Sequence, residues 1–316
     1  MDKENPKVSV IICAYNMERL RHVHEAVESI LGQTFKPYQI IVAVDHNEEL
    51  FQKLMAELPS KVTVVLNKGD LGAVATDNVG IGYSTGDVIA FMDDDAVAGS
   101  EWLEHLAKHY QEHSTAAVGG RLVSIWDNGR PCWFPEELDW VVGGTYKGHP
   151  ETQTQVRNLI LCNMSVRKQV IQSTGFFTVD LGRSKNWGTG AESEFFLRLK
   201  HQWPDAIILY EPSAVVYHKV PPQRTSLKYV VLRSYNEGFH KARIERTCAN
   251  LSESPISIEK SYLGYLVCTA IPRRLKRIYK KGSLSQVGAI IISIAATGAG
   301  YLAEKLKQIT KITDGH

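Results

Sequence analysis

Three consecutive carboxylates, Asp93, Asp94 and Asp95, directly follow the apolar run 88–92. A short, continuous apolar run of this kind is typical of a buried strand. Three like charges at one strand end repel one another, and a fold tolerates them most easily when a divalent cation neutralises them. Such a cation can also hold a diphosphate. The alternative is an acidic turn exposed to solvent, which the buried strand before it disfavours.

Other residues suited to chemistry also stand at the ends of predicted elements. Asp45 follows the apolar run 38–44, and His218 ends a further strand-like run. Glu192 and Glu194 begin a predicted helix, where carboxylates face the favourable end of the dipole, and Glu194 is expected to cap it. A lone histidine is as often structural as functional, so His218 stays open between these two interpretations.

The elements around these residues alternate between strands and helices. Buried strands are predicted at 7–14, 38–44, 62–66 and 88–92, with helices from Asn16 to Gly32, over 50–58 and over 73–83. Alternation of this kind indicates parallel strands with crossover helices. Ligands bind beyond the carboxyl ends of such strands. We therefore expect Asp45 and the three aspartates to meet at one crevice.

The second part of the chain predicts a helix over 102–110 and strands at 117–124, 158–166, 207–210 and 214–217, joined by long loops typical of substrate sites. The predicted fold class is α/β, with a mostly parallel, Rossmann-like central sheet. The predicted domains are a catalytic domain at 1–225, with a nucleotide half at 1–115 and an acceptor half at 116–225, and a basic helical tail at 226–316.

Four segments together resemble the family 2 glycosyltransferases in order and spacing: VSVIICAYN, the strand-end Asp45, NKGDLGAVATDNVGIGYSTGDVIAFMDDD and GAESEFFLRLK. The resemblance covers roughly residues 7–245 and is specific as a set. It implies the GT-A fold, transfer of a sugar from a nucleotide diphosphate donor with inversion of the anomeric centre, and a Mn²⁺ or Mg²⁺ ion.

The resemblance also assigns roles. Asp45 corresponds to the residue that reads the nucleobase, Asp93 to the nucleotide-side member of the DxD motif, and Asp95 to its metal ligand. Asp77 departs from the family, because many members have a basic residue there. The predicted donor-binding residues are Asp45, Asn78, Asp93 and Asp94, and the predicted metal-binding residues are Asp93, Asp95 and His218.

The implied reaction needs a base that deprotonates the acceptor hydroxyl. The acidic pair of the family aligns so that Ala191 replaces its first member and Glu192 its second. Glu192 is therefore the predicted general base. The alternative is an ordinary glutamate in the first turn of a helix.

Charge is unevenly distributed along the chain. The formal net charge of the 316 residues is only +2, but residues 219–316 carry 17 Lys and Arg against 6 Asp and Glu, and residues 1–218 carry 19 against 28. A basic tail suggests contact with phosphates on a lipid or on nucleic acid. The five cysteines lack CxxC spacing, so they favour a reducing compartment, and MDKENPK has no secretory apolar region.

The basic stretch HKVPPQRTSLKYVVLRSYNEGFHKARIER contains Arg224, Arg233 and Lys241, which we expect to contact acceptor phosphates because cationic side chains suit them. With WFPEELDWVVGGTY, this stretch resembles the archaeal glucosyl-dolichyl phosphate glucuronosyltransferases of the same family. Residues 282–303 carry no charge, and as a helix they would extend about 33 Å, enough to cross a hydrocarbon core of about 30 Å. Basic residues on both sides also suit a helix that lies in the membrane interface.

The predicted function is transfer of a sugar, glucuronic acid by resemblance, from a UDP-sugar to a lipid-linked dolichyl or polyprenyl phosphate saccharide at the cytoplasmic membrane face, without a nucleic acid partner. Alternatives within the class are a polyprenyl-phosphate sugar synthase and a cell-surface polysaccharide glycosyltransferase. A Rossmann oxidoreductase lacks its GxGxxG turn here, since the first turn reads AYNMER. A nonenzymatic binding protein leaves the aspartates unexplained. The cations Arg121, Arg157, Arg183 and Lys185 are unranked candidates for an acidic donor sugar.

Overall fold

The computed structural model describes residues 5–182, 190–251 and 255–313. The chain forms two compact units. Unit 1 comprises Met1–Val123 and Pro150–His218, and unit 2 comprises Ser124–His149 and Lys219–His316. Residues 124–149, which the sequence analysis placed in the acceptor half, thus group with the C-terminal helices.

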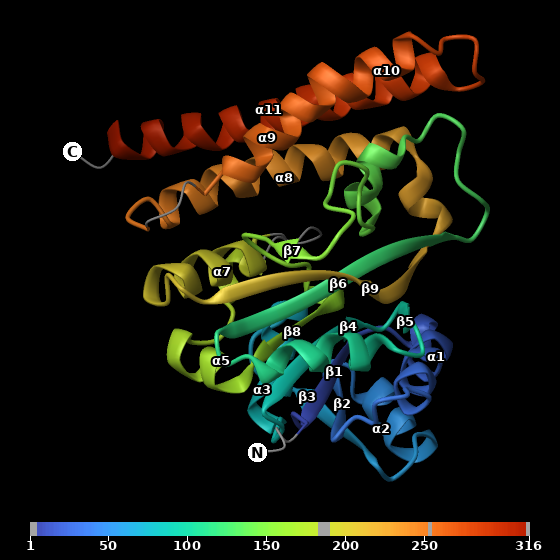
Figure 1. Cartoon of the computed structure of the whole chain (residues 1–316), viewed down its shortest axis with the longest axis vertical. Coiled ribbons are helices and arrows are strands. Elements are labelled where there is room, and N and C mark those ends of the chain that lie inside the picture. Colours follow the sequence, from blue (N-terminus) through green and yellow to red (C-terminus); the bar gives the residue numbers. More distant parts are fainter. Residues whose placement is uncertain (1–4, 183–189, 252–254, 314–316) are drawn as a thin grey trace. The chain divides into compact units, whose positions relative to one another are not determined.

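Unit 1 contains the four strands predicted from the first apolar runs. They are β1 (Val8–Ala14), β2 (Gln39–Asp45), β3 (Val62–Asn67) and β4 (Val88–Asp93). β1 pairs in parallel with β2 and β4, and β2 pairs in parallel with β3. The α/β fold class is confirmed, and Figure 1 shows these strands side by side.

The other half of the sheet is antiparallel. It contains β8 (Met164–Arg167), β6 (Thr115–Trp126), β9 (Ile207–Val220) and β5 (Ala96–Ala98), and β7 (Thr154–Gln155) also pairs with β9. The strand order over the described residues is β3-β2-β1-β4-β8-β6-β9-β5. The sheet is therefore mixed, with parallel pairing along β1 to β4 and antiparallel pairing beyond β4.

Two strand predictions differ from the structure. The predicted strands 207–210 and 214–217 form one strand, β9, which pairs with β7 before Pro212 and with β5 after it. The predicted strand 158–166 is instead a short 3-10 helix, η4 (Leu161–Asn163), followed by β8. Asn163 holds this turn, because its side chain donates to the carbonyls of Arg121 and Ala214.

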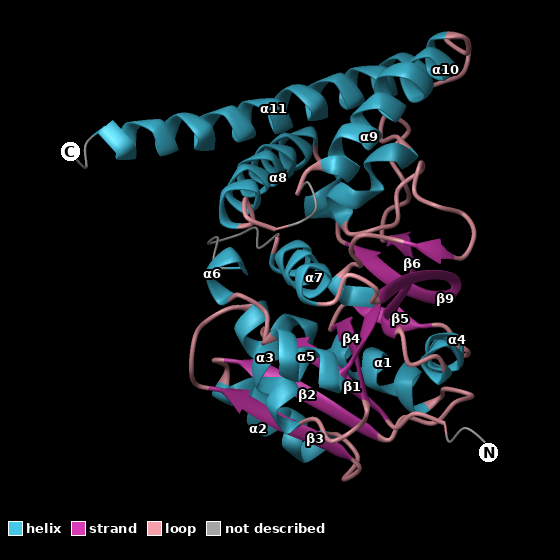
Figure 2. Ribbon diagram, turned by 60° about the vertical axis from the view of Figure 1, so that its left-hand side comes forward, coloured by secondary structure: helices cyan, strands magenta, loops and turns pink. Residues whose placement is uncertain are grey.

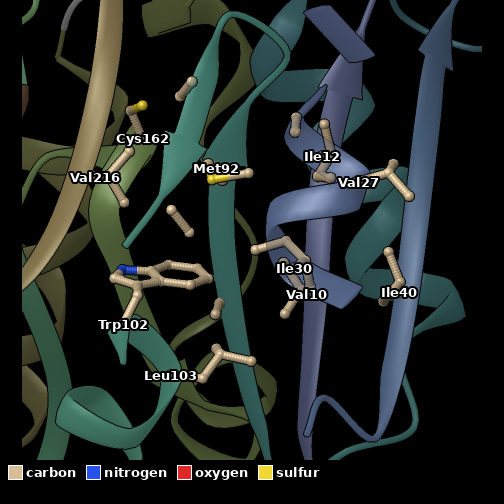
Figure 3. Packing of buried hydrophobic residues seen from close by; sticks show 14 of the residues in the cluster. Val10, Ile12, Val27, Ile30, Ile40, Met92, Trp102, Leu103, Cys162 and Val216 are labelled. Atoms are coloured by element: carbon tan, nitrogen blue, oxygen red, sulfur yellow. The ribbon is translucent and has the colours of Figure 1, made fainter. Parts of the chain in front are cut away.

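Helices cover both faces of the sheet. Alternate residues of β1 face opposite sides, so Val10 and Ile12 join one core cluster and Ile11 joins the other. Figure 3 shows Val27 and Ile30 of α1 packed beside Val10 and Ile12. The first face is covered by α1 (Leu20–Leu31), α2 (Glu48–Glu57) and α4 (Trp102–Ala107), and the second by α3 (Ala73–Tyr83), α5 (Lys168–Thr174) and α7 (Ala191–Gln202).

Shorter helical segments complete unit 1. Asn16 caps the 3-10 helix η1 (Met17–Arg19), which leads into α1, and Gly32 ends α1 as predicted. The predicted helix 102–110 is divided into α4 and the 3-10 helix η2 (Lys108–Gln111). The short α6 (Val179–Gly182) precedes α7.

Unit 2 is mainly helical (Figure 2). Its elements are the 3-10 helices η3 (Glu136–Val142) and η5 (Pro222–Thr225), the helices α8 (Leu227–Thr247), α9 (Ser257–Tyr265), α10 (Ile271–Leu275) and α11 (Ser283–Thr313), and the π-helix η6 (Leu266–Ala270). A third apolar cluster forms its core, with Phe134, Leu138, Val230 and Ile290 among its buried members. The predicted helical tail is thus present, and its apolar segment belongs to α11.

Candidate active site

The register of the sheet places the strand-end residues of unit 1 at one edge. Across β1 and β4, Cys13 pairs with Asp93, and across β2 and β3, Asp45 pairs with Asn67. Across β5 and β9, Ala96 pairs with His218, which brings His218 next to Asp95. Asp45 and the three aspartates therefore lie along the same edge of the sheet, and their meeting at one crevice stays a prediction.

His218 joins two of the three consecutive aspartates. Its Nε2 lies 3.2 Å from Asp95 Oδ1 and 3.9 Å from Asp93 Oδ2. The side chains of His218 and Asp95 are almost fully buried, whereas that of Asp93 is 47% exposed. The cluster is therefore open to solvent at Asp93, and a ligand can reach it there.

Arg19 neutralises part of the aspartate cluster, a contact that the sequence analysis missed. Its Nη1 lies 2.7 Å from Asp94 Oδ1 and 3.1 Å from Asp95 Oδ2. Arg19 lies in η1, directly after the turn that follows β1, and this turn places it beside the end of β4. The only signal in the sequence was a basic residue shortly after a strand end.

Asp94 is buried, with 2% of the residue exposed, as is Asp95 with 3%. Burial raises the pKa of Asp94 to about 7, although Arg19 acts in the opposite direction. Its Oδ2 has no hydrogen-bond partner among the described residues. Asp94 is thus an internal partner of Arg19, and its predicted contact with the donor stays a prediction.

Cys162 is a further potential metal ligand that the sequence did not reveal. Phe91 of β4 pairs with Met164 of β8, and continuing this antiparallel register places Cys162 opposite Asp93. One potential ligand atom from each of Asp93, Cys162 and His218 lies within 4.8 Å of the others. Figure 3 shows the Cys162 side chain beside Val216 of β9. Burial, reinforced by Asp93, raises the pKa of the Cys162 thiol well above its usual value.

These residues fit a divalent cation. Asp93 and Asp95 supply carboxylate oxygens, and His218 supplies an imidazole nitrogen already directed at both. The Nδ1 atom of His218 is buried and has no hydrogen-bond partner among the described residues. Carboxylates with one imidazole suit Mn²⁺ better than Mg²⁺, which prefers an all-oxygen shell.

Asp45 organises the loop after β3. Its Oδ1 lies 2.7 Å from His46 Nδ1 and 3.3 Å from Asn67 Nδ2, and its Oδ2 accepts a hydrogen bond of 3.0 Å from the Gly72 amide. His46 has a φ of 50°, a left-handed conformation that histidine tolerates better than most residues. The loop and Asp45 thus hold each other in place, and recognition of the nucleobase by Asp45 stays a prediction.

Two polar residues of α3 face different surroundings. Asn78 donates to the Phe177 carbonyl at 2.9 Å and accepts from the Phe177 amide at 3.1 Å, so its side chain already binds backbone. Asp77 is buried, and burial together with the charges of Asp93 and Glu192 raises its pKa well above the usual value. Asp77, Asp93 and Glu192 are therefore close enough to interact. The donor-binding role of Asn78 stays a prediction.

Glu192 and Glu194 lie in the first turn of α7, as predicted. The predicted cap at Glu194 is wrong, because its Oε2 accepts from Thr178 at 2.8 Å and its Oε1 from Arg198 at 2.8 Å. Glu194 thus links α7 to Thr178, directly before α6, and is 7% exposed. Glu192 interacts with Asp77 and so lies on the side of the carboxylate cluster. Its role as general base stays a prediction.

The three predicted phosphate-binding cations belong to unit 2. Arg224 donates to the Val142 carbonyl at 3.5 Å. Arg233 and Lys241 both contact Glu237, at 3.2 and 3.3 Å. Although burial alone would raise it, these two cations lower the pKa of Glu237. Arg183 and Lys185 lie outside the described residues.

Comparison with known proteins identifies the family. The profile of glycosyl transferase family 2 matches residues 9–175. The glucosyl-dolichyl phosphate glucuronosyltransferase of Haloferax volcanii is 35% identical over 309 residues, which cover 94% of this chain and 95% of that protein. The chain belongs to glycosyltransferase family 2. The predicted resemblance and transferase class are thereby confirmed.

Solved structures of glycosyltransferases show the same fold. The mannosyltransferase PcManGT from Pyrobaculum calidifontis, in complex with GDP-Man and Mn²⁺, has a TM-score of 0.61 at 13% identity, covering 95% of this chain and 88% of that one. GalNAc-T7 with UDP, GalNAc and Mn²⁺ has a TM-score of 0.54 at 16% identity, covering 83% and 54%. This family 2 glycosyltransferase therefore has the predicted GT-A fold.

Proposed function

We propose that this glycosyltransferase transfers glucuronic acid from UDP-glucuronic acid to glucosyl-dolichyl phosphate at the cytoplasmic face of the cell membrane, as a step in building a lipid-linked glycan. The observation that carries the proposal is the identity of 35% to the Haloferax volcanii enzyme over nearly the full length of both chains. The basic, apolar C-terminal segment supports a membrane location. Among the described residues, Ser283–Gln308 is one helix long and apolar enough to cross a membrane.

The carboxylates of unit 1 would hold the donor through a cation. Asp93, Asp95 and His218 are the residues that would bind Mn²⁺ or Mg²⁺, as their distances allow. When bound, such an ion neutralises the diphosphate that leaves the sugar. Arg19 holds the Asp94 and Asp95 carboxylates in position, so the ligands are ordered before the donor arrives.

Glu192 would then act on the acceptor. Its carboxylate accepts the proton of the glucosyl hydroxyl as that oxygen attacks the anomeric carbon and the bond to the UDP oxygen breaks. The attack comes from the side opposite UDP and inverts the anomeric centre. A positioned base typically contributes a factor of about 100 to 10,000. A bare polyprenyl phosphate acceptor would need no base, because its oxygen is already an anion.

The test is an assay with a panel of UDP-sugars and two acceptors, glucosyl-dolichyl phosphate and bare dolichyl phosphate, with mass spectrometry of the lipid products. The expected product carries one glucuronic acid residue on the glucosyl lipid and requires Mn²⁺ or Mg²⁺. A sugar added to bare dolichyl phosphate would instead show a synthase. Product from neither lipid would favour a polysaccharide acceptor.

A further inference from the structure

The helix α11 has a property shared by two kinds of membrane segment. Its Ser283–Gln308 stretch has the length and composition of a spanning helix, yet only 28% of the apolar window is buried inside the protein. A helix that crosses a bilayer and a helix that lies along its surface can both look like this. The contacts of α11 within unit 2 distinguish a spanning helix from a surface helix.

α8 packs along α11 with close backbone contact. Ser234 Oγ and Ser293 Oγ lie 2.8 Å apart. A Cβ atom added at Gly238 would lie 1.8 Å from the Thr297 carbonyl oxygen, and one at Gly300 would lie 1.9 Å from the Tyr235 carbonyl oxygen. The residue numbers of the contacting pairs increase together along α8 and α11, so the two helices run in the same direction (Figure 1). The two helices therefore form one tightly packed pair.

α8 carries charge along the stretch that covers α11. Arg233, Glu237 and Lys241 form ion pairs along one helix face, and Glu245 pairs with Lys305 of α11 at 2.7 Å. If α11 crossed a bilayer, α8 would have to cross beside it or lose these contacts. A charged residue at the bilayer centre is strongly unfavourable. The pair therefore resists insertion across a membrane.

The face of α11 away from α8 is apolar and exposed. The fractional exposures are 62% for Leu284, 52% for Ile291, 60% for Leu302 and 63% for Leu306, and Ala295 between them is also exposed. These positions recur at intervals of four or seven residues, so they form one stripe along the helix. Ser293, Thr297 and Gly300, which contact α8, lie on the opposite side. We call this exposed set the α11 stripe.

A basic and apolar segment precedes the α11 stripe. Leu275, Ile278 and Tyr279 are exposed by 48%, 58% and 78%. Between and around them stand five exposed cations, Arg273, Lys276, Arg277, Lys280 and Lys281. Arg274, the remaining cation of 273–281, is used internally, since it forms an ion pair with the fully buried Glu137.

This arrangement is complementary to an anionic lipid surface. From residue 271 to residue 308 the single acidic residue is Glu304, and it is buried. Each exposed cation strengthens binding to an anionic bilayer. Apolar side chains interleaved with cations can enter the boundary between headgroups and acyl chains. A nucleic acid would bind the cations but leave the apolar α11 stripe exposed to water.

We propose that unit 2 binds the membrane on one side, with α11 lying along the interface and not across it. The α11 stripe faces the acyl chains, and the cations of 273–281 bind anionic headgroups. This inference rests on the proposed function only in that the acceptor is lipid-linked. It adds how the protein meets the membrane: α11, packed against α8, holds unit 2 at the membrane surface without crossing the bilayer.

The direct test measures depth in the bilayer. In full-length protein with Cys13, Cys132 and Cys268 replaced by serine, one cysteine at a time is introduced at Leu284, Ala295 or Leu306 and labelled with a polarity-sensitive fluorophore. Quenching by lipids brominated at shallow or deep positions is then measured in phosphatidylglycerol-containing vesicles. We expect the same shallow depth at all three positions. Deep quenching confined to Ala295 would show a crossing helix and overturn the proposal, as would no quenching at any position.

A second experiment uses charge substitutions. Ile291→Glu and Leu302→Glu should each weaken binding to these vesicles by roughly tenfold, because each moves a carboxylate into the apolar boundary. Met55→Glu is the control, since Met55 is 55% exposed and lies in unit 1. Calorimetric binding of UDP-glucuronic acid should be unchanged in all three variants, which separates this test from the proposed transferase activity. Equal vesicle binding by all three would contradict the surface anchor.

Discussion

At the scale of single residues, the carboxylates of unit 1 divide into internal partners and groups that can meet a ligand. Asp94 is buried and bound by Arg19, whereas Asp93 is half exposed and shares His218 with Asp95. Glu194 is bound by Arg198, whereas Glu192 interacts with Asp77 on the side of the cluster. Asp93, Asp95 and Glu192 are therefore the residues that we propose take part in the chemistry, although Asp95 also contacts Arg19.

The role of Glu192 is tested by the isosteric change Glu192→Gln. We expect kcat to fall about 100- to 10,000-fold, because the amide cannot accept the acceptor proton. Binding of UDP-glucuronic acid should be unchanged. Glu49→Gln, at an exposed position of α2, is the matched control and should keep full activity. Near-normal turnover by Glu192→Gln would remove the general base from the account.

Arg19 and a divalent cation should substitute for each other in part. In Arg19→Gln, Asp94 and Asp95 lose the cation that neutralises them. Removing one partner of a buried ion pair typically costs about 3–5 kcal/mol. We therefore expect a lower melting temperature in chelator and a larger recovery on adding Mn²⁺ than the wild type shows. A variant destabilised equally with and without Mn²⁺ would contradict the shared site.

The sequence allowed the strand-end residues to be predicted, but not their neighbours. Asp45 and Asp93 were found because an apolar run ends directly before each of them. The positions of Arg19 and Cys162, and the electrostatic interaction of Glu192 with Asp77, depend on strand register and on loop paths between distant segments. No local pattern encodes such pairings, so only the folded chain reveals them.

At the scale of elements, the parallel strands were predictable because residues buried on both faces form continuous apolar runs. The antiparallel half was predicted less well. β9 was predicted as two strands separated by residues 211–213, but it is continuous, and β7 pairs with its first part and β5 with its last part. α11 was predicted from its composition, but its pairing with α8 depends on glycines whose role appears only when the helices meet.

Glu211 ties η2 to β9 and should make stability depend on pH. Its Oε2 lies 2.9 Å from Lys108 Nζ and 2.8 Å from His109 Nε2. Although burial alone would raise it, these hydrogen bonds lower the pKa of Glu211 to about 2. A carboxylate with a lowered pKa stabilises the fold above its unfolded pKa, and this contribution disappears as pH falls toward the folded pKa.

Glu211→Gln should therefore lower the free energy of unfolding by roughly 1–2 kcal/mol between pH 5 and 7, a figure reduced for the partly exposed Lys108. The difference from wild type should shrink as pH falls below about 4.5. Urea titrations at pH 7, 5 and 4 measure it. A difference that stays constant over this range would refute the assigned cause.

The close approach of α8 and α11 is tested by two glycine substitutions. Gly238→Ala puts a methyl group against the Thr297 carbonyl and should destabilise the protein by about 1–3 kcal/mol. Gly298→Ala is the matched control, because an added Cβ there meets nothing within 4 Å. It should be neutral or stabilising by up to about 1 kcal/mol. Equal effects of the two changes on thermal unfolding would argue against a packed pair.

At the scale of the whole molecule, the two units have different proposed roles. Unit 1 has the sheet, the carboxylate cluster and α7, to which the proposed function assigns donor binding and the general base. Unit 2 has the cations and the apolar stripe suited to a lipid surface. The family and the fold follow from the comparisons, whereas the donor sugar and acceptor lipid are proposals that need product analysis.

One calorimetric measurement tests the central claim, that a cation on the strand-end carboxylates holds the donor. UDP-glucuronic acid is titrated into wild-type enzyme and into Asp95→Ala, each with Mn²⁺ and with chelator. We predict tight binding only by the wild type with Mn²⁺, and a loss of affinity of at least about tenfold, or about 1.4 kcal/mol, in the other three titrations. Equal affinity in all four titrations would contradict the account.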